Sequence, residues 1–152
     1  MKFKHHLLIG IIFSTIITIV SEITILEGTI IFLASILIDF DHYIWYGAVT
    51  KDWNPFHAIK WYIKKTPEWK NISQKEKNKF KKGVFIFHSV GFWIVLYFLS
   101  LFNKVFLLIL IGIGIHILAD YFNLIKNGEP IYNKVSALYT WKRNKNKKEL
   151  VS

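Results

Sequence analysis

Apolar residues are concentrated in four blocks along the chain, and polar stretches separate these blocks. Within each block, aliphatic and aromatic residues follow one another almost without interruption, instead of recurring at the spacing of an amphipathic helix. A helix needs about 20 apolar residues to cross the hydrocarbon core of a bilayer. The pattern therefore predicts an all-α, polytopic membrane protein with four transmembrane helices, over residues 6–20, 29–46, 84–102 and 105–125.

The first block is the shortest of the four, and it follows two lysines near the N-terminus. This arrangement also fits the charged and apolar regions of a signal peptide. However, residues 21–24 offer no cleavage motif of small residues. We therefore expect the first block to remain in the protein as a transmembrane helix.

Basic residues lie almost entirely on one side of the predicted bundle. Two precede the first block, ten lie between Lys51 and Lys82, seven follow Ile125, and Lys104 alone lies in a turn on the other side. Because segments rich in Lys and Arg stay in the cytoplasm, we predict a multi-pass cell-membrane protein with both termini and the long central loop in the cytoplasm. The formal net charge of +10 then favours anionic membrane lipids as partners, and no nucleic-acid partner is expected.

The central loop contains the signals of an amphipathic interfacial helix. Asn54 and Pro55 have the types expected at the N-cap and first position of a helix. The residues that then share one face are Phe56, Ile59, Tyr62 and Ile63. Such a helix would lie on the cytoplasmic surface of the membrane.

A second helix start is predicted at Ser73, where Ser-Gln-Lys-Glu has the spacing of a capping box and would lead straight into the third span. We expect residues 1–141 to form a single integral-membrane domain. Residues 142–152 are polar and basic, which predicts a flexible tail.

Acids and histidines inside the apolar blocks gather in the half of each block nearest a lysine-rich flank. Such groups are costly inside a bilayer and usually face a partner or a wet cavity. Asp39 and His42 are three residues apart and His116 and Asp120 four apart, so each pair projects from one face of its helix. At about 1.5 Å of rise per residue, these residues and His88 lie at overlapping depths. The pattern predicts a single site built from three helices.

The residue types of this site favour a metal ion. Imidazole and carboxylate ligands without sulfur suit zinc, manganese or iron better than calcium, and the chain has no cysteine. Either His5 or His6, at the start of the first block, could close the site. The predicted ligands are Asp39, His42, His88, His116, Asp120 and His6.

Two questions stay open at this point. On a regular helix Asp41 points about 200° away from Asp39, so either Asp41 serves a second ion or another helix, or the helix unwinds near Phe40. The whole set could also form a proton-relay or packing network without a metal, as intramembrane acids and histidines often do.

Four short motifs follow one another in a distinctive order. They are a histidine at the start of the first span, Asp39-Phe40-Asp41-His42 at the end of the second, His88-Ser89 at the start of the third, and His116-x-x-x-Asp120 in the last. This order resembles the membrane-bound metal-dependent hydrolase family, which includes LexA-regulated inner-membrane proteins of bacteria and archaeal relatives. The likeness spans the chain from His5 to Asp120. It departs from the family pattern at two places. Ile38 stands where proline is usual, and Lys82-Gly83 stands where the family usually has His-Arg-Gly.

The resemblance implies a metal-dependent hydrolase with its site at the cytoplasmic face. In such an enzyme the metal lowers the pKa of a water and polarises a phosphoryl or carbonyl oxygen. Asp41 is then the candidate catalytic residue, as general base or bridging ligand, and Ser89 a hydrogen-bonding neighbour of the ligands. A site just beneath the head groups would meet phosphodiester or ester bonds of lipids, and the basic loop would attract anionic ones.

Two other functions remain as alternatives. A divalent-metal binding or transport protein would use similar ligands, but a transporter is expected to hold them near the membrane midplane. The outer half of this chain offers only Glu22 and Glu27. A membrane anchor that recruits a partner through its basic loop would need no buried acids. The oligomeric state is left open.

Overall fold

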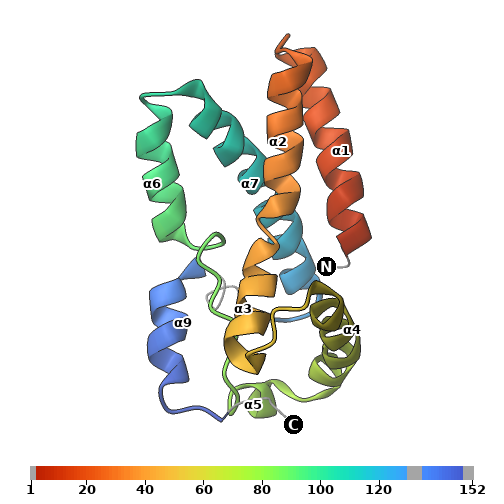
Figure 1. Ribbon diagram of the computed structural model, residues 1–152, viewed down its shortest axis with the longest axis vertical. Coiled ribbons are helices and arrows are strands. Elements are labelled where there is room, and N and C mark those ends of the chain that lie inside the picture. The colour runs from red at the N-terminus through yellow and green to blue at the C-terminus, as the bar shows by residue number, and fades with distance from the viewer. Residues whose placement is uncertain (1–2, 130–134, 149–152) are drawn as a thin grey trace.

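The structure is a computed structural model that describes residues 3–129 and 135–148. These residues form helices and one isolated β-bridge, so the all-α prediction is confirmed (Figure 1). The helices are α1 (Phe3–Val20), α2 (Ile25–Leu37), α3 (Phe40–Thr50), α4 (Pro55–Asn71), α5 (Gln74–Lys77), α6 (Val90–Ser100), α7 (Lys104–Lys126) and α9 (Ala137–Asn144).

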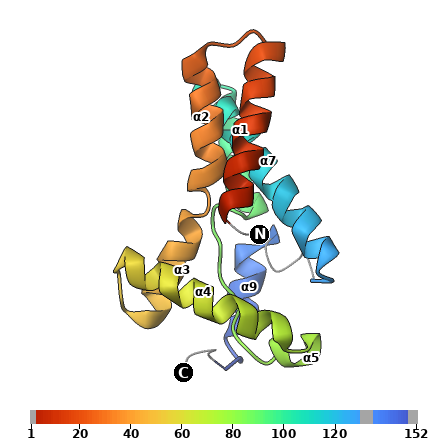
Figure 2. The ribbon, with the colours of Figure 1, turned by 90° about the vertical axis from the view of Figure 1, so that its right-hand side faces the viewer.

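The most apolar helices form one bundle, and the more polar helices lie at one end of it. Helix α2 packs against both α1 and α7, and α6 packs against α7. Helices α3, α4, α5 and α9 occupy the end opposite the α1–α2 turn (Figure 1). Figure 2 shows α4 running across this end, transverse to the bundle. Among the described residues α7, with 23 residues, is the one helix long and apolar enough to cross a membrane. The four-span topology is therefore not confirmed.

The second predicted span, residues 29–46, is two helices rather than one. Helix α2 ends at Leu37 and α3 begins at Phe40. Between them the backbone N–H of Asp39 donates to the carbonyl of Ile36 (3.2 Å), and that of His42 donates to the carbonyl of Asp39 (2.9 Å). These three-residue spacings tighten the turn. The helix thus unwinds next to Phe40, which was one of the two alternatives for placing Asp41.

The third predicted span, residues 84–102, is also shorter than expected. Ser73 does cap a helix, since its hydroxyl accepts from the N–H of Glu76 (3.3 Å), but α5 ends at Lys77 and α6 begins only at Val90. The prediction that one helix leads from Ser73 into the span is therefore wrong. His88 lies in the connection between α5 and α6 and not on a helix.

Contacts with the C-terminal segment explain the course of this connection. The side chain of Asn144 accepts from the N–H of Lys82 (3.0 Å) and donates to its carbonyl (2.7 Å). The guanidinium of Arg143 donates to the carbonyls of Phe80 (3.1 Å) and Asn78 (3.0 Å). In a continuous helix, these backbone groups would bond to one another. Here they form hydrogen bonds with α9 instead.

These contacts also correct the predicted flexible tail. Lys142, Arg143 and Asn144 belong to α9, and Lys148 forms the isolated parallel bridge with Phe80. The unit predicted to end at residue 141 therefore extends at least to residue 148. Residues 149–152 of the predicted tail lie outside the described residues.

The amphipathic helix of the central loop is present as α4. The side chain of Asn54 accepts from the N–H groups of Phe56 (2.9 Å) and His57 (3.4 Å), as expected for an N-cap. Phe56, Ile59 and Ile63 are exposed, so these three residues of the apolar face are turned away from the rest of the molecule.

Helices α2 and α7 approach closely at Gly112, which is buried. A β-carbon added at Gly112 would lie 2.3 Å from the carbonyl oxygen of Ile31 and 2.8 Å from the β-carbon of Ala34. A β-carbon added at Gly114 would meet nothing within 4 Å. The absence of a side chain at Gly112 is thus required by the packing, whereas that at Gly114 is not.

This contrast predicts opposite effects of two alanine substitutions. Gly112→Ala should lower the stability of the folded protein in detergent by about 1–3 kcal/mol, because the helices must separate. Gly114→Ala should raise it by up to about 1 kcal/mol, because alanine favours the helix. Thermal unfolding followed by circular dichroism measures both. Equal effects of the two substitutions would contradict the close contact at Gly112.

Candidate metal centre

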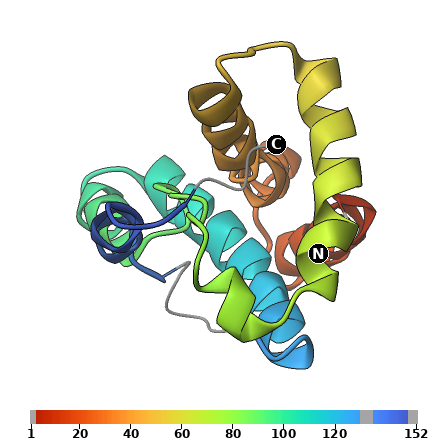
Figure 3. The ribbon, with the colours of Figure 1, turned by 90° about the horizontal axis from the view of Figure 1, so that it is seen from below.

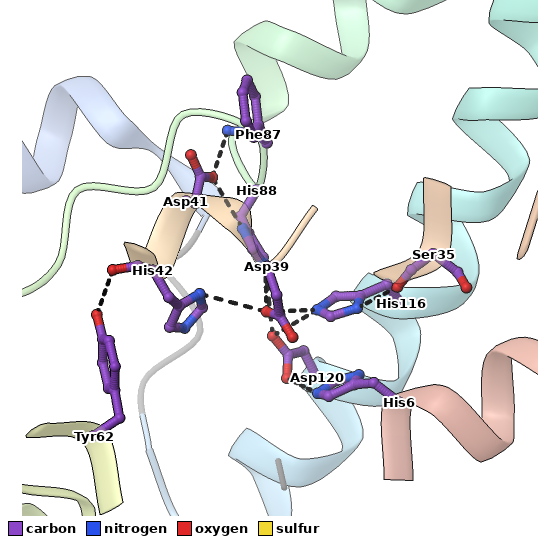
Figure 4. Close-up of polar contacts among 10 residues, drawn as sticks. All are labelled: His6, Ser35, Asp39, Asp41, His42, Tyr62, Phe87, His88, His116 and Asp120. Carbon is purple, nitrogen blue, oxygen red and sulfur yellow. Dashed lines mark hydrogen bonds and ion pairs between the residues drawn. The ribbon is translucent and has the colours of Figure 1, made fainter. Parts of the chain in front are cut away.

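The six predicted ligands lie in one cluster beside the break between α2 and α3 (Figure 4). They form three overlapping groups, and in each group one possible ligand atom per residue lies within 4.8 Å of the others. The groups are His6 with Asp39 and His116, Asp39 with His42 and His88, and His88 with His116 and Asp120. Each group could hold a metal ion, and shared members allow either one ion or two.

Asp39 is the residue that the histidines share. Its Oδ1 atom lies 3.4 Å from His42 Nδ1, 3.4 Å from His116 Nε2 and 3.9 Å from His88 Nε2. The Oδ2 atom of Asp120 lies 3.6 Å from His116 Nε2 and 3.8 Å from His88 Nε2. Two imidazole nitrogens and two carboxylates therefore converge on one small volume.

The first helix contributes His6, which resolves the choice between the two N-terminal histidines. His6 is buried, and its Nε2 lies 3.3 Å from Asp120 Oδ1. Its ring stacks on that of His116, with 4.0 Å between the centroids. His5 is exposed, because it lies about 100° away around the same helix.

A hydrogen bond to the backbone orients His116. Its Nδ1 lies 2.8 Å from the carbonyl oxygen of Ser35, and since a carbonyl only accepts, Nδ1 carries the hydrogen. In the neutral ring Nε2 then has a free lone pair directed toward Asp39 and Asp120. Nε2 makes no hydrogen bond within the described part of the chain. Metal-binding histidines typically show this arrangement, in which the other ring nitrogen donates to a fixed acceptor.

His88 is oriented in the same way, by Asp41. The Oδ2 atom of Asp41 lies 3.2 Å from His88 Nδ1 and also accepts from the backbone N–H of Phe87 (2.7 Å). Asp41 is 3% exposed and lies on the far side of the His88 ring from Asp39 (Figure 4). The structure does not place Asp41 in any of the three groups, because the break before α3 turns it toward the α5–α6 connection. Its position corresponds to orienting His88, and gives no support to the predicted role as general base or bridging ligand.

The cluster is open on one side. His6, His88, His116 and Asp120 are buried, whereas the side chains of Asp39 and His42 are 25% and 29% exposed. Water or a substrate can therefore reach the cluster past Asp39 and His42. Figure 3, viewed from the end that carries the polar helices, shows α3, α4 and the α5–α6 connection at this end of the bundle.

Aromatic residues line the open side. His42 stacks on Phe85, with 4.3 Å between the centroids, and the Tyr62 hydroxyl donates to the carbonyl of His42 (2.7 Å). Burial, and secondarily the charge of Asp39, raise the pKa of Tyr62. The hydroxyl therefore stays protonated as a donor at neutral pH.

Sequence reasoning missed Ser35 and Tyr62. Ser35 lies four residues before Asp39, so its place on the same helix face was a detectable signal. Tyr62 was expected on the apolar face of α4, and no sequence signal distinguished it from its neighbours there. Ser89 had been expected to bond within its helix or to a ligand. Its hydroxyl donates to the carbonyl of Ile86 (2.6 Å), in the connection just before α6.

Comparison of the chain with protein-family models, with curated proteins and with solved structures finds no match. The resemblance of its motifs to a hydrolase family therefore stays a prediction. The structure itself establishes a group of histidines and aspartates that could hold a metal ion.

The position of Asp41 behind His88 predicts the effect of replacing it. Asp41→Asn should weaken metal binding about 10–100-fold, as is typical when the partner of a ligating histidine is changed. Asp52→Asn is the matched control, since Asp52 accepts from Tyr46 and His57 at the α3–α4 corner and should leave binding unchanged. Competition with a chromogenic chelator measures the affinity. Unchanged affinity together with lost catalysis in Asp41→Asn would instead restore the general-base role.

Proposed function

We propose that the protein is a membrane-embedded, metal-dependent hydrolase whose site lies at the cytoplasmic face and acts on phosphodiester or ester bonds of lipids. One observation carries this proposal. The Nε2 atoms of His88 and His116 are directed at Asp39 and Asp120, and each ring is fixed from behind by an acceptor, Asp41 or Ser35. In each ring, the nitrogen that faces these carboxylates is not the one that contacts Asp41 or Ser35, which is the arrangement typical of metal-binding histidines.

The ligand types favour zinc, manganese or iron, which accept imidazole and carboxylate together. Such an ion, when bound, supplies a water of lowered pKa and polarises the bond to be broken. The buried residues His88, His116 and Asp120, which form one of the three groups, would hold it on the closed side. Asp39 and His42 form the open edge, where they can bind a water, accept its proton and orient the scissile group.

Placement of the cluster at one end of the bundle favours hydrolysis over metal transport. A transporter needs ligands near the midplane and access from both sides. At the opposite end Glu27 pairs with Lys104 (2.6 Å), and this pair joins the α1–α2 and α6–α7 turns. The anchor alternative gives no reason for burying three histidines with Asp120.

Membrane insertion is supported by the surface of the bundle as well as by α7. Large apolar side chains are exposed on every helix of the bundle, far beyond the patches usual for soluble monomers. Examples are Leu8, Ile19, Leu37, Phe98 and Leu118. We propose a multi-pass protein of the cell membrane with both termini cytoplasmic, because 19 of the 20 basic residues fall on that side.

Anionic lipids are the proposed partners because of the basic segments beside the site. Lys82 lies five residues after Lys77 in the connection that leads to His88. Burial, together with neighbouring Arg143, lowers the pKa of Lys82 to about 8. The acid nearby, Glu129, pairs with Lys77 (3.0 Å). A phosphate beside Lys82 would therefore be favourable on charge grounds.

Replacement of Asp120 distinguishes a metal centre from a cluster that only stabilises the helix bundle. Asp120→Asn keeps the size of the side chain but removes its charge, so metal affinity should fall by more than the 10–100-fold expected for an indirect partner. Metal content and hydrolysis of phosphatidylglycerol should fall together, at nearly unchanged folded yield. Elemental analysis and a lipid-release assay measure these quantities.

Glu27→Gln, at the opposite end of the bundle, is the control and should leave metal content and hydrolysis unchanged. Full metal content in Asp120→Asn would remove Asp120 from the ligands. Bound metal in the parent without hydrolysis of any lipid ester or diester would contradict the enzymatic proposal and favour metal binding or transport.

The absence of cysteine allows the topology to be tested with single substitutions. Lys75→Cys and Asn146→Cys should react with a membrane-impermeant maleimide only after the cells are opened. Ser21→Cys, in the α1–α2 turn, should react in intact cells. Labelling of Lys75→Cys in intact cells would overturn the cytoplasmic placement of the site.

A further inference from the structure

An apolar groove of about 330 Å³ lies between α2 and the pair of helices α6 and α7. We call it the α2–α6–α7 groove. Its volume falls in the range of about 300–1,000 Å³ that is usual for small-molecule sites. Its walls include Leu33 and Leu37 from α2, Phe92 from α6, and Ile109 and Ile113 from α7.

Some residues that line this groove are close neighbours of cluster residues along the chain. Ile38, which lines it, directly precedes Asp39, and Phe87, which also lines it, directly precedes His88. Ile113 lies three residues before His116, on the same helix. The groove is therefore bordered on three elements by neighbours of cluster residues.

A hydrogen-bond network connects the groove wall to the cluster. The Oδ2 atom of Asp41 accepts from the N–H of Phe87 and lies within hydrogen-bond distance of His88 Nδ1. The same carboxylate thus holds a residue of the groove and a residue of the cluster (Figure 4). Asp41 thus links the wall of the groove at Phe87 to the cluster at His88.

The other side of the groove faces outward through apolar side chains. Leu33 is 46% exposed and Leu37 is 62% exposed, on the part of the bundle that we place in the bilayer. An occupant must therefore be apolar along its length and polar at the end near the cluster. An acyl chain joined to a head group has this form.

A second groove of similar volume provides a comparison. It lies between α1 and α2 and is lined in part by the polar side chains Ser14, Thr15 and Thr18. None of its lining residues directly precedes or follows a cluster residue. If the grooves only contacted bilayer lipid, both should bind acyl chains equally. A role in substrate binding predicts binding at the α2–α6–α7 groove in preference to the other.

We infer that the α2–α6–α7 groove binds one acyl chain of the substrate lipid and places the bond at the base of its head group beside Asp39 and His42. This inference rests on the proposed function for the identity of the bond that is cleaved. Binding of the chain itself does not depend on catalysis. The inference makes the enzyme selective for lipids with long chains.

The test uses the full-length protein in vesicles that contain phosphatidylglycerol with a photoactivatable diazirine on one acyl chain. After illumination, mass spectrometry should locate the label on groove residues such as Leu33, Phe92 and Ile109, in preference to the α1–α2 groove. Leu33→Trp fills the groove and should reduce this labelling about tenfold, the effect of losing contact with roughly two methylene groups. Ile19→Trp fills the other groove and should not.

A second readout compares substrates. Leu33→Trp should slow hydrolysis of long-chain phosphatidylglycerol about tenfold and leave a water-soluble short-chain analogue unaffected. Leu37→Trp, at a more exposed position of the same groove, should have the same effect on both substrates. It replaces Leu33→Trp in the test if that variant does not fold.

The outcomes separate the two proposals. Equal labelling of both grooves, or equal slowing of long-chain and short-chain substrates, would overturn the acyl-chain site and leave the hydrolase intact. Concentrated labelling in a parent protein that cleaves no lipid would overturn the hydrolase and leave the lipid site intact. A third outcome would assign the groove to a second copy of the chain. If two copies of the protein crosslink through the groove and the lipid label is then lost, the inference is overturned.

Discussion

The contact between α2 and α7 is the constraint on which the site depends. Because Gly112 has no side chain, α7 can approach the backbone of α2 at Ile31, and one turn further along the ring of His116 meets the carbonyl of Ser35. That hydrogen bond fixes which ring nitrogen faces the cluster. With His116 in place, Asp39 at the end of α2 and Asp120 on α7 both come within reach of its Nε2. The stacking of His6 on the same ring adds α1.

Formation of the cluster costs free energy unless a cation is bound. Burying carboxylates and imidazoles costs free energy unless each is paired and hydrogen-bonded, and His6 Nδ1 and His116 Nε2 make no hydrogen bond within the described residues. A bound cation would offset this cost by neutralising Asp39 and Asp120 together. The broken helix serves the same purpose, since it turns Asp39 and His42 toward the cluster and leaves Asp41 behind His88. The candidate metal centre and the break in the helix therefore coincide at residues 38 and 39.

The helical class and the six cluster residues could be predicted from the sequence, because buried ionisable groups in apolar segments have few other roles. The role of Asp41 could not, since it follows from the break after Leu37, and a helical period assumes continuity. The position of His88 could not either. Its connection is held by Asn144 and Arg143, about 60 residues away along the chain, and such long-range hydrogen bonds leave no local pattern. For the same reason the ordered part of the predicted tail was missed.

The central claim is that histidine and aspartate side chains of this cluster bind a metal ion. X-ray absorption at the edge of the bound metal, on protein purified in detergent, tests it most directly. The account predicts nitrogen and oxygen ligands at about 2.0–2.2 Å, with the outer-shell scattering of imidazole, and a spectrum that loses part of this scattering in His116→Gln. Protein that is folded yet binds no metal, or a spectrum that His116→Gln leaves unchanged, would contradict the account.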